Sequence, residues 1–405
     1  MVTKSTLNLA VALDGAGWHP AAWRLPSARG TELFSPGYWV DLAREAERGD
    51  IDFVTIDDSL AIQSARRGVP DERVDQVRGR LDAVLVAARM APATRSLGLV
   101  PTVTTTHTEP FHVSKAIATL DYVSAGRGGF QARVSATGLE ARQFGRRHLP
   151  DLPPGAGAVR DGTRSELPAH VSELFDEAAD FVEVVRRLWD SWEDDAEIRD
   201  VATGRFIDRD RLHYIDFTGR WFSVKGPGIT PRPPQGQPPV FVLAHVPVAF
   251  RLAARSADVV FTTPDGVAGA RSIVVGIRSE EESVGRVDPP LMVFADLVVF
   301  LDADGPKAQE RKEALDELDG RSYRSDAQVF VGTPAELVDL LAEWQTPGLD
   351  GFRLRPGALP VDLEAITRQV VPLARERGLL PNQPHGATLR ERLGLTRPAN
   401  RYAHA

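Results

Sequence analysis

The sequence contains no cysteine among its 405 residues. This absence excludes disulfide bonds, thiolate nucleophiles and cysteine-ligated zinc or iron–sulfur clusters, and it agrees with a reducing compartment. A metal site would have to be built from histidine and carboxylate side chains. His107 and His112 lie on either side of Glu109, but this spacing matches no compact ligand motif. We therefore expect no metal.

Long apolar runs and an excess of positive charge are missing as well. No stretch reaches the ~18–20 apolar residues that a membrane helix needs. The short apolar run at the N-terminus leads directly into Asp14, unlike a secretory signal. The 48 Lys and Arg residues are outnumbered by 56 Asp and Glu, and the resulting net charge of −8 repels a phosphate backbone. We expect a cytoplasmic protein that binds neither membranes nor nucleic acid.

The chain alternates between short apolar runs and amphipathic segments with a helical period. A strand of a parallel barrel is buried on both faces and therefore reads as a continuous apolar run. The eight predicted strands are residues 7–13, 53–56, 97–104, 128–134, 240–243, 259–262, 291–301 and 351–354. This count predicts an α/β fold, a single (β/α)₈ TIM-barrel domain over residues 1–405. A doubly wound open sheet is the alternative.

One crossover, between the fourth and fifth strands, is enlarged. Residues 136–239 hold a loop rich in proline and glycine, a strong amphipathic helix and a proline-dense approach to the fifth strand. Because loops at the carboxyl ends of barrel strands carry function, this insertion is a candidate lid or substrate wall. A solvated elaboration is supported equally well. The tail, residues 380–405, either tucks under the barrel or meets a partner subunit.

Polar side chains follow the ends of the predicted strands, where a barrel gathers them around its mouth. They include carboxylates, hydroxyls, imidazoles and one guanidinium. In chain order they are Asp57, Asp58, Thr104, Thr105, His107, Arg133, Ser135 and His245. Simpler structural roles are open to several of them, because one aspartate can cap the following helix and threonine suits strand packing.

Six stretches of the chain are characteristic when taken in order. The first two are AWRLPSARG and YWVDLAREAERGDIDFVTIDDS. The others are SLGLVPTVTTTHTEPFHVSKAIATLDYVSAGRGGF, FVEVVRRLWDSWEDD, FSVKGPGITPRPPQGQPPVFVLA and GATLRERLGLTRPAN. Together they resemble the bacterial luciferase-like flavin-dependent monooxygenase superfamily, in its branch of nitrilotriacetate monooxygenase, pristinamycin synthase and dibenzothiophene-sulfone monooxygenase. The resemblance runs almost from end to end.

This resemblance implies a (β/α)₈ barrel, usually oligomeric, that binds reduced FMN supplied by a separate flavin reductase. It further implies that O₂ is used to oxidise a small organic substrate, whose identity the sequence does not indicate. In such an enzyme the cofactor carries the difficult chemistry, and the protein orients the substrate and excludes water. A large insertion beside the mouth would serve that purpose.

The resemblance also implies roles for individual residues. Asp58 matches the family's aspartate at the second strand tip, and Ser135 matches the last serine of its fourth-strand motif. The cofactor-binding residues that it implies are Asp58, Thr104, Thr105, Ser135 and His170, and the candidate catalytic residue is His107, which replaces a usual tyrosine.

Other positions depart from the family pattern around the cofactor phosphate. Gln131 stands in place of an asparagine, and Phe175 in place of a tyrosine. Pro247 replaces a phosphate-binding serine and has neither a hydroxyl nor a backbone N–H to offer. Arg133 and His245 are the predicted cofactor-binding residues that would compensate for these losses.

Two other functions are compatible with the same bowl. The first is a deazaflavin (F420)-dependent oxidoreductase, which would transfer hydride without oxygen. The second is a non-catalytic barrel that has lost its flavin and acts as a binding or partner subunit. Pro247, Phe175 and Gln131 favour this loss, whereas Asp58, the threonine run and Ser135 favour retained function.

Overall fold

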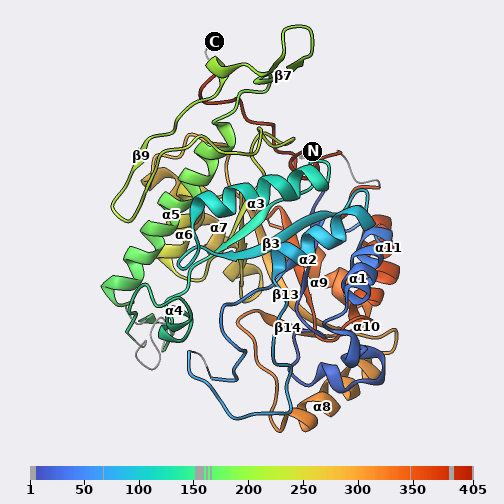
Figure 1. Ribbon diagram of the computed structural model, residues 1–405. Coiled ribbons are helices and arrows are strands. Elements are labelled where there is room, and N and C mark those ends of the chain that lie inside the picture. The colour runs from blue at the N-terminus through green and yellow to red at the C-terminus, as the bar shows by residue number, and fades with distance from the viewer. Residues whose placement is uncertain are drawn as a thin grey trace.

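Eight parallel strands form a closed barrel surrounded by helices in the computed structural model (Figure 1). The structure describes residues 6–66, 68–150, 159–160, 163–164, 167–346, 348–382 and 387–403. The barrel strands are β1 (Asn8–Leu13), β2 (Phe53–Ile56), β3 (Gly98–Thr104), β4 (Phe130–Arg133), β11 (Val240–Leu243), β12 (Val259–Thr262), β13 (Met292–Leu301) and β15 (Gly351–Pro356). All eight predicted strands are confirmed, and with them the predicted TIM barrel.

The barrel closes because each of the eight strands has a parallel neighbour on both sides. Val11 of β1, for example, is paired with Val54 of β2 on one side and with Leu354 of β15 on the other. The second half of the ring closes through β12 and β13, where Phe261 is paired with Phe294. Strands in this setting have no solvent-facing side, which explains their continuous apolar sequences.

Helices cover the outside of the barrel and connect successive strands (Figure 1). The first begins at a serine cap, since the Ser35 hydroxyl accepts from the Tyr38 N–H. The covering helices are α1 (Pro36–Arg48), α2 (Ala83–Met90), α3 (Pro110–Val123), α5 (Ala169–Asp190), α6 (Pro247–Ser256), α7 (Gly266–Ser283), α9 (Pro334–Trp344), and α10 (Val361–Ala365) with α11 (Val371–Glu376). No helix in these described ranges is long and apolar enough to cross a membrane.

The enlarged crossover, residues 136–239, contains the barrel helix α5 and several smaller elements. The smaller elements are α4 (Gly138–Phe144) and the strand pairs β5–β6 (Val159–Arg160, Thr163–Arg164), β7–β8 (Glu197–Asp200, Arg205–Ile207) and β9–β10 (Phe217–Thr218, Ser223–Val224). The β7–β8 hairpin projects at the same pole as the C-terminus (Figure 1). Part of the predicted Pro/Gly-rich loop, residues 151–158, 161–162 and 165–166, lies outside the described residues.

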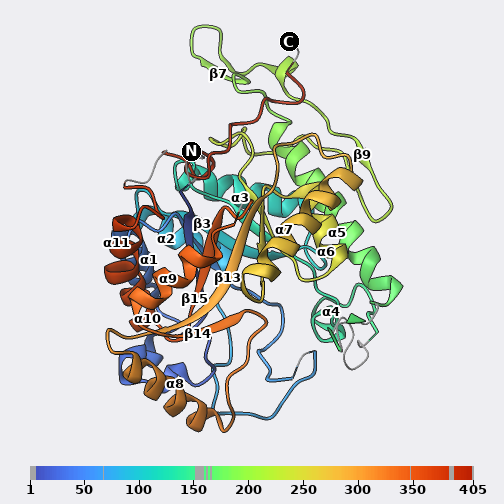
Figure 2. The ribbon, with the colours of Figure 1, turned by 180° about the vertical axis from the view of Figure 1, so that it is seen from behind.

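A ninth strand, β14 (Gln328–Gly332), was not expected from the sequence. It follows α8 (Gly305–Asp319) and pairs in parallel with residues 297–301 of β13, outside the barrel ring (Figure 2). This pairing is possible because β13 is ten residues long and extends past its barrel neighbours. Only the last residue of β14 is buried, which explains why its sequence gives a weak strand signal.

The inside of the barrel has two layers of different chemistry. At the amino-terminal ends of the strands, four buried phenylalanines pack with ring centroids 5.1–6.2 Å apart, and the tail helix α12 (Leu389–Arg392) packs Leu389 against them. The four are Phe53, Phe241, Phe261 and Phe294. Nearer the carboxyl ends, the Arg353 guanidinium lies 3.7 Å from the Phe261 ring centroid. The tail therefore seals one end, and charged groups begin above the aromatic layer.

Candidate active site

A cavity of about 770 Å³ opens at the carboxyl ends of the barrel strands. Its size is within the ~300–1,000 Å³ typical of small-molecule sites. Asp57 and Asp58 follow β2, Arg133 and Ser135 end or follow β4, and His245 follows β11, and all five line it. The structure thus brings these predicted residues together around one hollow.

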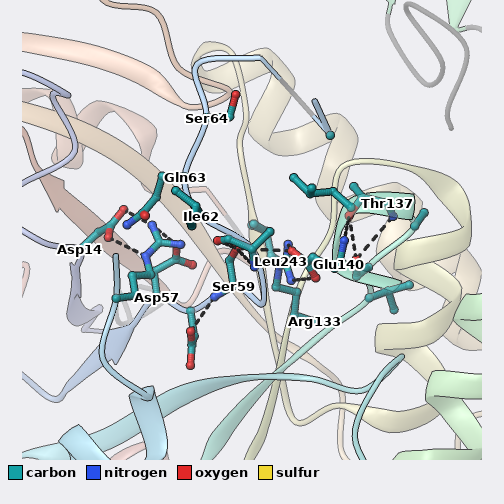
Figure 3. Close-up of a pocket in the computed structure, with 18 of the residues that line it drawn as sticks. Asp14, Asp57, Ser59, Ile62, Gln63, Ser64, Arg133, Thr137, Glu140 and Leu243 are labelled. Atoms are coloured by element: carbon teal, nitrogen blue, oxygen red, sulfur yellow. Dashed lines mark hydrogen bonds and ion pairs between the residues drawn. The ribbon is translucent and has the colours of Figure 1, made fainter. Parts of the chain in front are cut away.

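One side of the cavity carries an acidic group held by a single arginine (Figure 3). The Arg80 guanidinium donates to both carboxylate oxygens of Asp14, at 2.7 and 3.2 Å, and lies 3.1 Å from Asp57 Oδ2. Burial raises the pKa of Asp14, and the charge of Arg80 opposes this effect. Asp14 and Arg80 are cavity residues that the sequence reasoning missed, because their contact joins β1 to the loop after β2.

Asp58 lines the cavity and also supports a helix. Its Oδ1 accepts from the Ser59 N–H at 2.6 Å, and its Oδ2 accepts from the Ala83 N–H at 3.0 Å. Ala83 is the first residue of α2, so Asp58 helps to cap that helix, as expected for one member of the aspartate pair. Burial raises the pKa of Asp58.

The opposite side of the cavity carries an ion pair between Arg133 and Glu140 (Figure 3). The guanidinium donates to both Glu140 oxygens, at 2.9 and 2.8 Å, and to Thr104 Oγ1 at 2.9 Å. Burial acts to raise the pKa of Glu140, but the hydrogen bonds and charge of Arg133 outweigh it and lower that pKa. The positive charge of Arg133 is therefore already matched inside the site. Glu140 belongs to α4 and was not singled out from the sequence.

His245 is held through both ring nitrogens. Nδ1 lies 2.9 Å from Thr263 Oγ1, and Nε2 lies 3.2 Å from Asp326 Oδ2. Burial lowers the pKa of His245, which favours the neutral imidazole at pH 7. Asp326 also accepts from Arg355, whose charge keeps the pKa of that carboxyl low although burial acts to raise it.

Buried charges form the floor beneath the cavity. Asp296, which is fully buried, accepts from Arg353 Nε at 2.8 Å and from Arg355 Nε at 3.0 Å. Arg353 also donates to Gln131 Oε1 at 2.7 Å, and Gln131 lines the cavity. The sequence reasoning missed this network. The available signal was charge within barrel strands, since a buried charge requires a partner.

Part of the cavity wall is apolar. It lies between the amino-terminal part of α5 and the first two turns of α6, and we call it the apolar arm. The α6 helix begins at Pro247, and its cap residue, Val246, contributes no side-chain hydrogen bond. The residues of the apolar arm are Val171, Phe175, Val246, Ala249 and Leu252.

Four predicted site residues do not line this cavity. Thr104 accepts from Arg133, and Thr105 Oγ1 donates to the Arg133 carbonyl at 3.1 Å, so both support β4 from behind. His107 stacks on Phe144 with ring centroids 5.2 Å apart. The buried Nε2 atoms of His107 and His170 have no hydrogen-bond partner within the described part of the chain. The direct cofactor or catalytic roles of these four residues stay predictions.

Comparisons with known proteins agree with one another. The model of the luciferase-like monooxygenases matches residues 18–351. N-acetyl-S-(2-succino)cysteine monooxygenase of Bacillus subtilis (strain 168) is 30% identical, with 99% of each chain covered. Nitrilotriacetate monooxygenase component A of Aminobacter aminovorans is 29% identical, with 100% of this chain and 99% of that protein covered. A solved structure of riboflavin lyase with modified FMN and riboflavin has a TM-score of 0.80 and 25% identity, with 98% of each chain covered.

Proposed function

The chain belongs to the luciferase-like monooxygenase family, and on that premise we propose that it is the oxygenating component of a two-component enzyme. A separate reductase would supply reduced flavin, and the enzyme would use O₂ to oxidise a small organic substrate. The relative named as component A of nitrilotriacetate monooxygenase supports this division of labour. Assembly into a homo-oligomer and a cytoplasmic location stay predictions.

The observation that carries the proposal is the cavity at the mouth of the barrel. It is deep enough to remove a flavin ring from water, and hydrogen-bonding side chains stand on two opposite sides of it. Bound reduced flavin supplies the reaction with O₂, which no amino-acid side chain provides. The cavity residues would orient the ring and keep water away from it.

We assign ring contacts to four cavity residues. Asp58 and Ser135 offer a carboxylate and a hydroxyl from the tips of β2 and β4. His245 presents an imidazole fixed by Thr263 and Asp326, and Arg133 presents a guanidinium fixed by Glu140. Because their partners already hold these side chains, they would lose little conformational freedom when the ring binds. Reduced FMN is the cofactor form that the resemblance implies.

Anaerobic titration with reduced FMN, followed by absorbance, tests the proposal. We expect a Kd below ~10 μM, which corresponds to about −7 kcal/mol. The variant Ile62→Trp places a large side chain at the cavity and should weaken binding at least tenfold, because Ile62 lines the cavity. Val201→Trp is its matched control, since Val201 is an exposed aliphatic residue remote from the cavity, between β7 and β8.

Three outcomes are decisive. Tight binding, with oxygen consumption that depends on an added flavin reductase, supports the monooxygenase. Binding of a deazaflavin but of no flavin supports the hydride-transfer alternative. Binding of neither cofactor at about 1 mM, which is only about −4 kcal/mol, contradicts both enzymatic functions and supports the non-catalytic barrel.

A further inference from the structure

Three helices begin beside the cavity, and each lacks the usual opening for an anion. The N-terminus of a helix binds phosphate through unpaired N–H groups and its positive dipole end. At α2, the first N–H group is taken by the carboxylate of Asp58. At α4, the first turn contains Glu140, whose own charge occupies the positive end. At α6, the first residue is Pro247, which has no N–H group.

The cationic side chains of the cavity are also already matched. Arg80 is paired with Asp14 and Asp57, and Arg133 is paired with Glu140. Two further lining arginines have carboxylate partners at 2.6 and 3.0 Å, and these pairs are Arg78–Asp71 and Arg321–Asp319. A phosphate dianion would have to compete with these carboxylates for each guanidinium.

Arg66 differs from the other cavity arginines. Its guanidinium donates to the carbonyl oxygen of Pro70 at 2.8 Å, and within the described residues it has no carboxylate partner. It belongs to an exposed stretch of the loop after β2, where water and salt weaken a charge–charge contact. Arg66 is therefore the one arginine at the cavity that could favour a phosphate, and it can be tested alone.

The apolar arm gives the cavity a region in which a charge is unfavourable. Val171, Phe175, Val246, Ala249 and Leu252 offer no polar side-chain atom to a ligand. Transfer of a phosphate into such surroundings would remove its water without replacing the hydrogen bonds. An uncharged hydroxylated tail can instead lie along the arm and direct its hydroxyl groups to the solvent-facing side.

We infer that this cavity recognises a flavin by its ring and its uncharged tail but not by its phosphate, so that riboflavin binds at least as tightly as FMN. The inference rests on the proposed function, because it presupposes that the cavity holds a flavin. It follows from the charges around the cavity, where the positive groups already have negative partners and the apolar arm has none to offer.

The test is anaerobic titration of the full-length protein with reduced riboflavin and with reduced FMN under identical conditions. We expect the Kd of FMN to be equal to that of riboflavin within threefold or to be larger, at both low and high salt. A tenfold or greater preference for FMN would overturn the inference and leave the proposed function standing. Binding of neither flavin would overturn both.

Two variants should create the missing preference. Glu140→Gln removes the carboxylate that neutralises Arg133, and it should lower the Kd of FMN at least fivefold without changing that of riboflavin. Pro247→Ser restores an N–H group and a hydroxyl at the start of α6 and should act in the same direction. The matched control is Glu177→Gln, because Glu177 accepts two hydrogen bonds from Arg147 in the same way but does not line the cavity.

Arg66→Gln completes the design. We expect this variant to bind FMN and riboflavin as the parent protein does, within threefold. A selective tenfold loss of FMN affinity in Arg66→Gln would show that the rim of the cavity holds the phosphate and would overturn the inference. The same conclusion would follow if Glu140→Gln and Pro247→Ser, both folded and binding riboflavin normally, left the FMN affinity unchanged.

Discussion

The two ends of the barrel interior are built on opposite principles. At the closed end, four phenylalanine rings and Leu389 of the tail fill the space with apolar contacts. At the open end, Asp296 joins Arg353 and Arg355 in a buried ionic network under the cavity. The closed end gains stability from the removal of apolar surface from water. The open end has to offset the desolvation of three charged groups.

This contrast shows where stability and function are separated in the chain. Replacing the aromatic layer should affect unfolding and leave ligand binding alone. Replacing the ionic network should affect both, because Gln131 connects the network to the cavity surface. Barrel enzymes in general carry stability at the amino-terminal face and chemistry at the carboxyl-terminal face.

The largest effect is expected for Asp296→Asn. The substitution leaves two buried guanidinium groups without a counter-ion, so we expect a loss of roughly 3–5 kcal/mol in the free energy of unfolding, measured with urea. Asp326→Asn is the control, because Asp326 also binds Arg355 but its side chain is 46% exposed, and it should cost less than half as much. Equal losses in the two variants would contradict a special cost of buried charge.

The next effect concerns the seal at the closed end. Leu389→Ala removes a fully buried side chain that packs against the aromatic layer, and it should lower the free energy of unfolding by about 2–4 kcal/mol. The Kd of reduced flavin should stay within twofold of the parent value. Leu318→Ala, at a position 38% exposed, should have little effect on either quantity. A large change in flavin affinity for Leu389→Ala would break the separation between the two ends.

Acid should weaken the attachment of the tail through Asp258. This carboxylate accepts from Arg390 of the tail at 3.2 Å and from Arg186 of α5 at 2.7 Å. Burial acts to raise its pKa, but the two arginines lower it to about 2 from the ordinary value of 3.8. A lowered pKa contributes stability that is complete above pH 4 and is lost as the pH falls through about 2, by about 2 kcal/mol.

The variant Asp258→Asn isolates this contribution. The difference in free energy of unfolding between the parent protein and the variant should shrink by about 2 kcal/mol between pH 5 and pH 2. Urea unfolding curves at several pH values measure it. A difference that does not change with pH would show that the tail is not held by this charge.

The smallest effect is expected where the tail helix begins. The Thr388 hydroxyl accepts from the Glu391 N–H, and the Glu391 side chain accepts from the Thr388 N–H, which together form a capping box. Thr388→Ala should cost about 1 kcal/mol in the free energy of unfolding. Thr119→Ala, at an exposed position within α3, should cost less than half of that. A result for Thr388→Ala as large as for Leu389→Ala would mean that the cap, and not the apolar contact, holds the seal.

The fold could be predicted because its main signal is local. Each barrel strand is apolar on both faces, so runs such as 53–56 and 259–262 are visible without knowledge of their partners. The additional strand β14 was missed because its burial is partial and its pairing depends on the unusual length of β13. Residues 291–301 already formed the longest predicted run, which was the available hint.

The candidate site was predictable only where residues follow strand ends. Asp58, Arg133, Ser135 and His245 lie around the cavity because the topology of a barrel places all strand tips at one face. The partners of these residues could not be predicted in this way. Asp326 lies 81 positions from His245, and Asp296 lies 57 positions from Arg353, so only the folded chain reveals that their charges are matched.

A crystal structure of the protein soaked with riboflavin would test the central claim most directly. The account predicts electron density for an isoalloxazine ring in the cavity, within contact of Asp58 on one side and His245 on the other. Density for the ring outside this cavity, or a cavity without flavin at a saturating concentration, would contradict it.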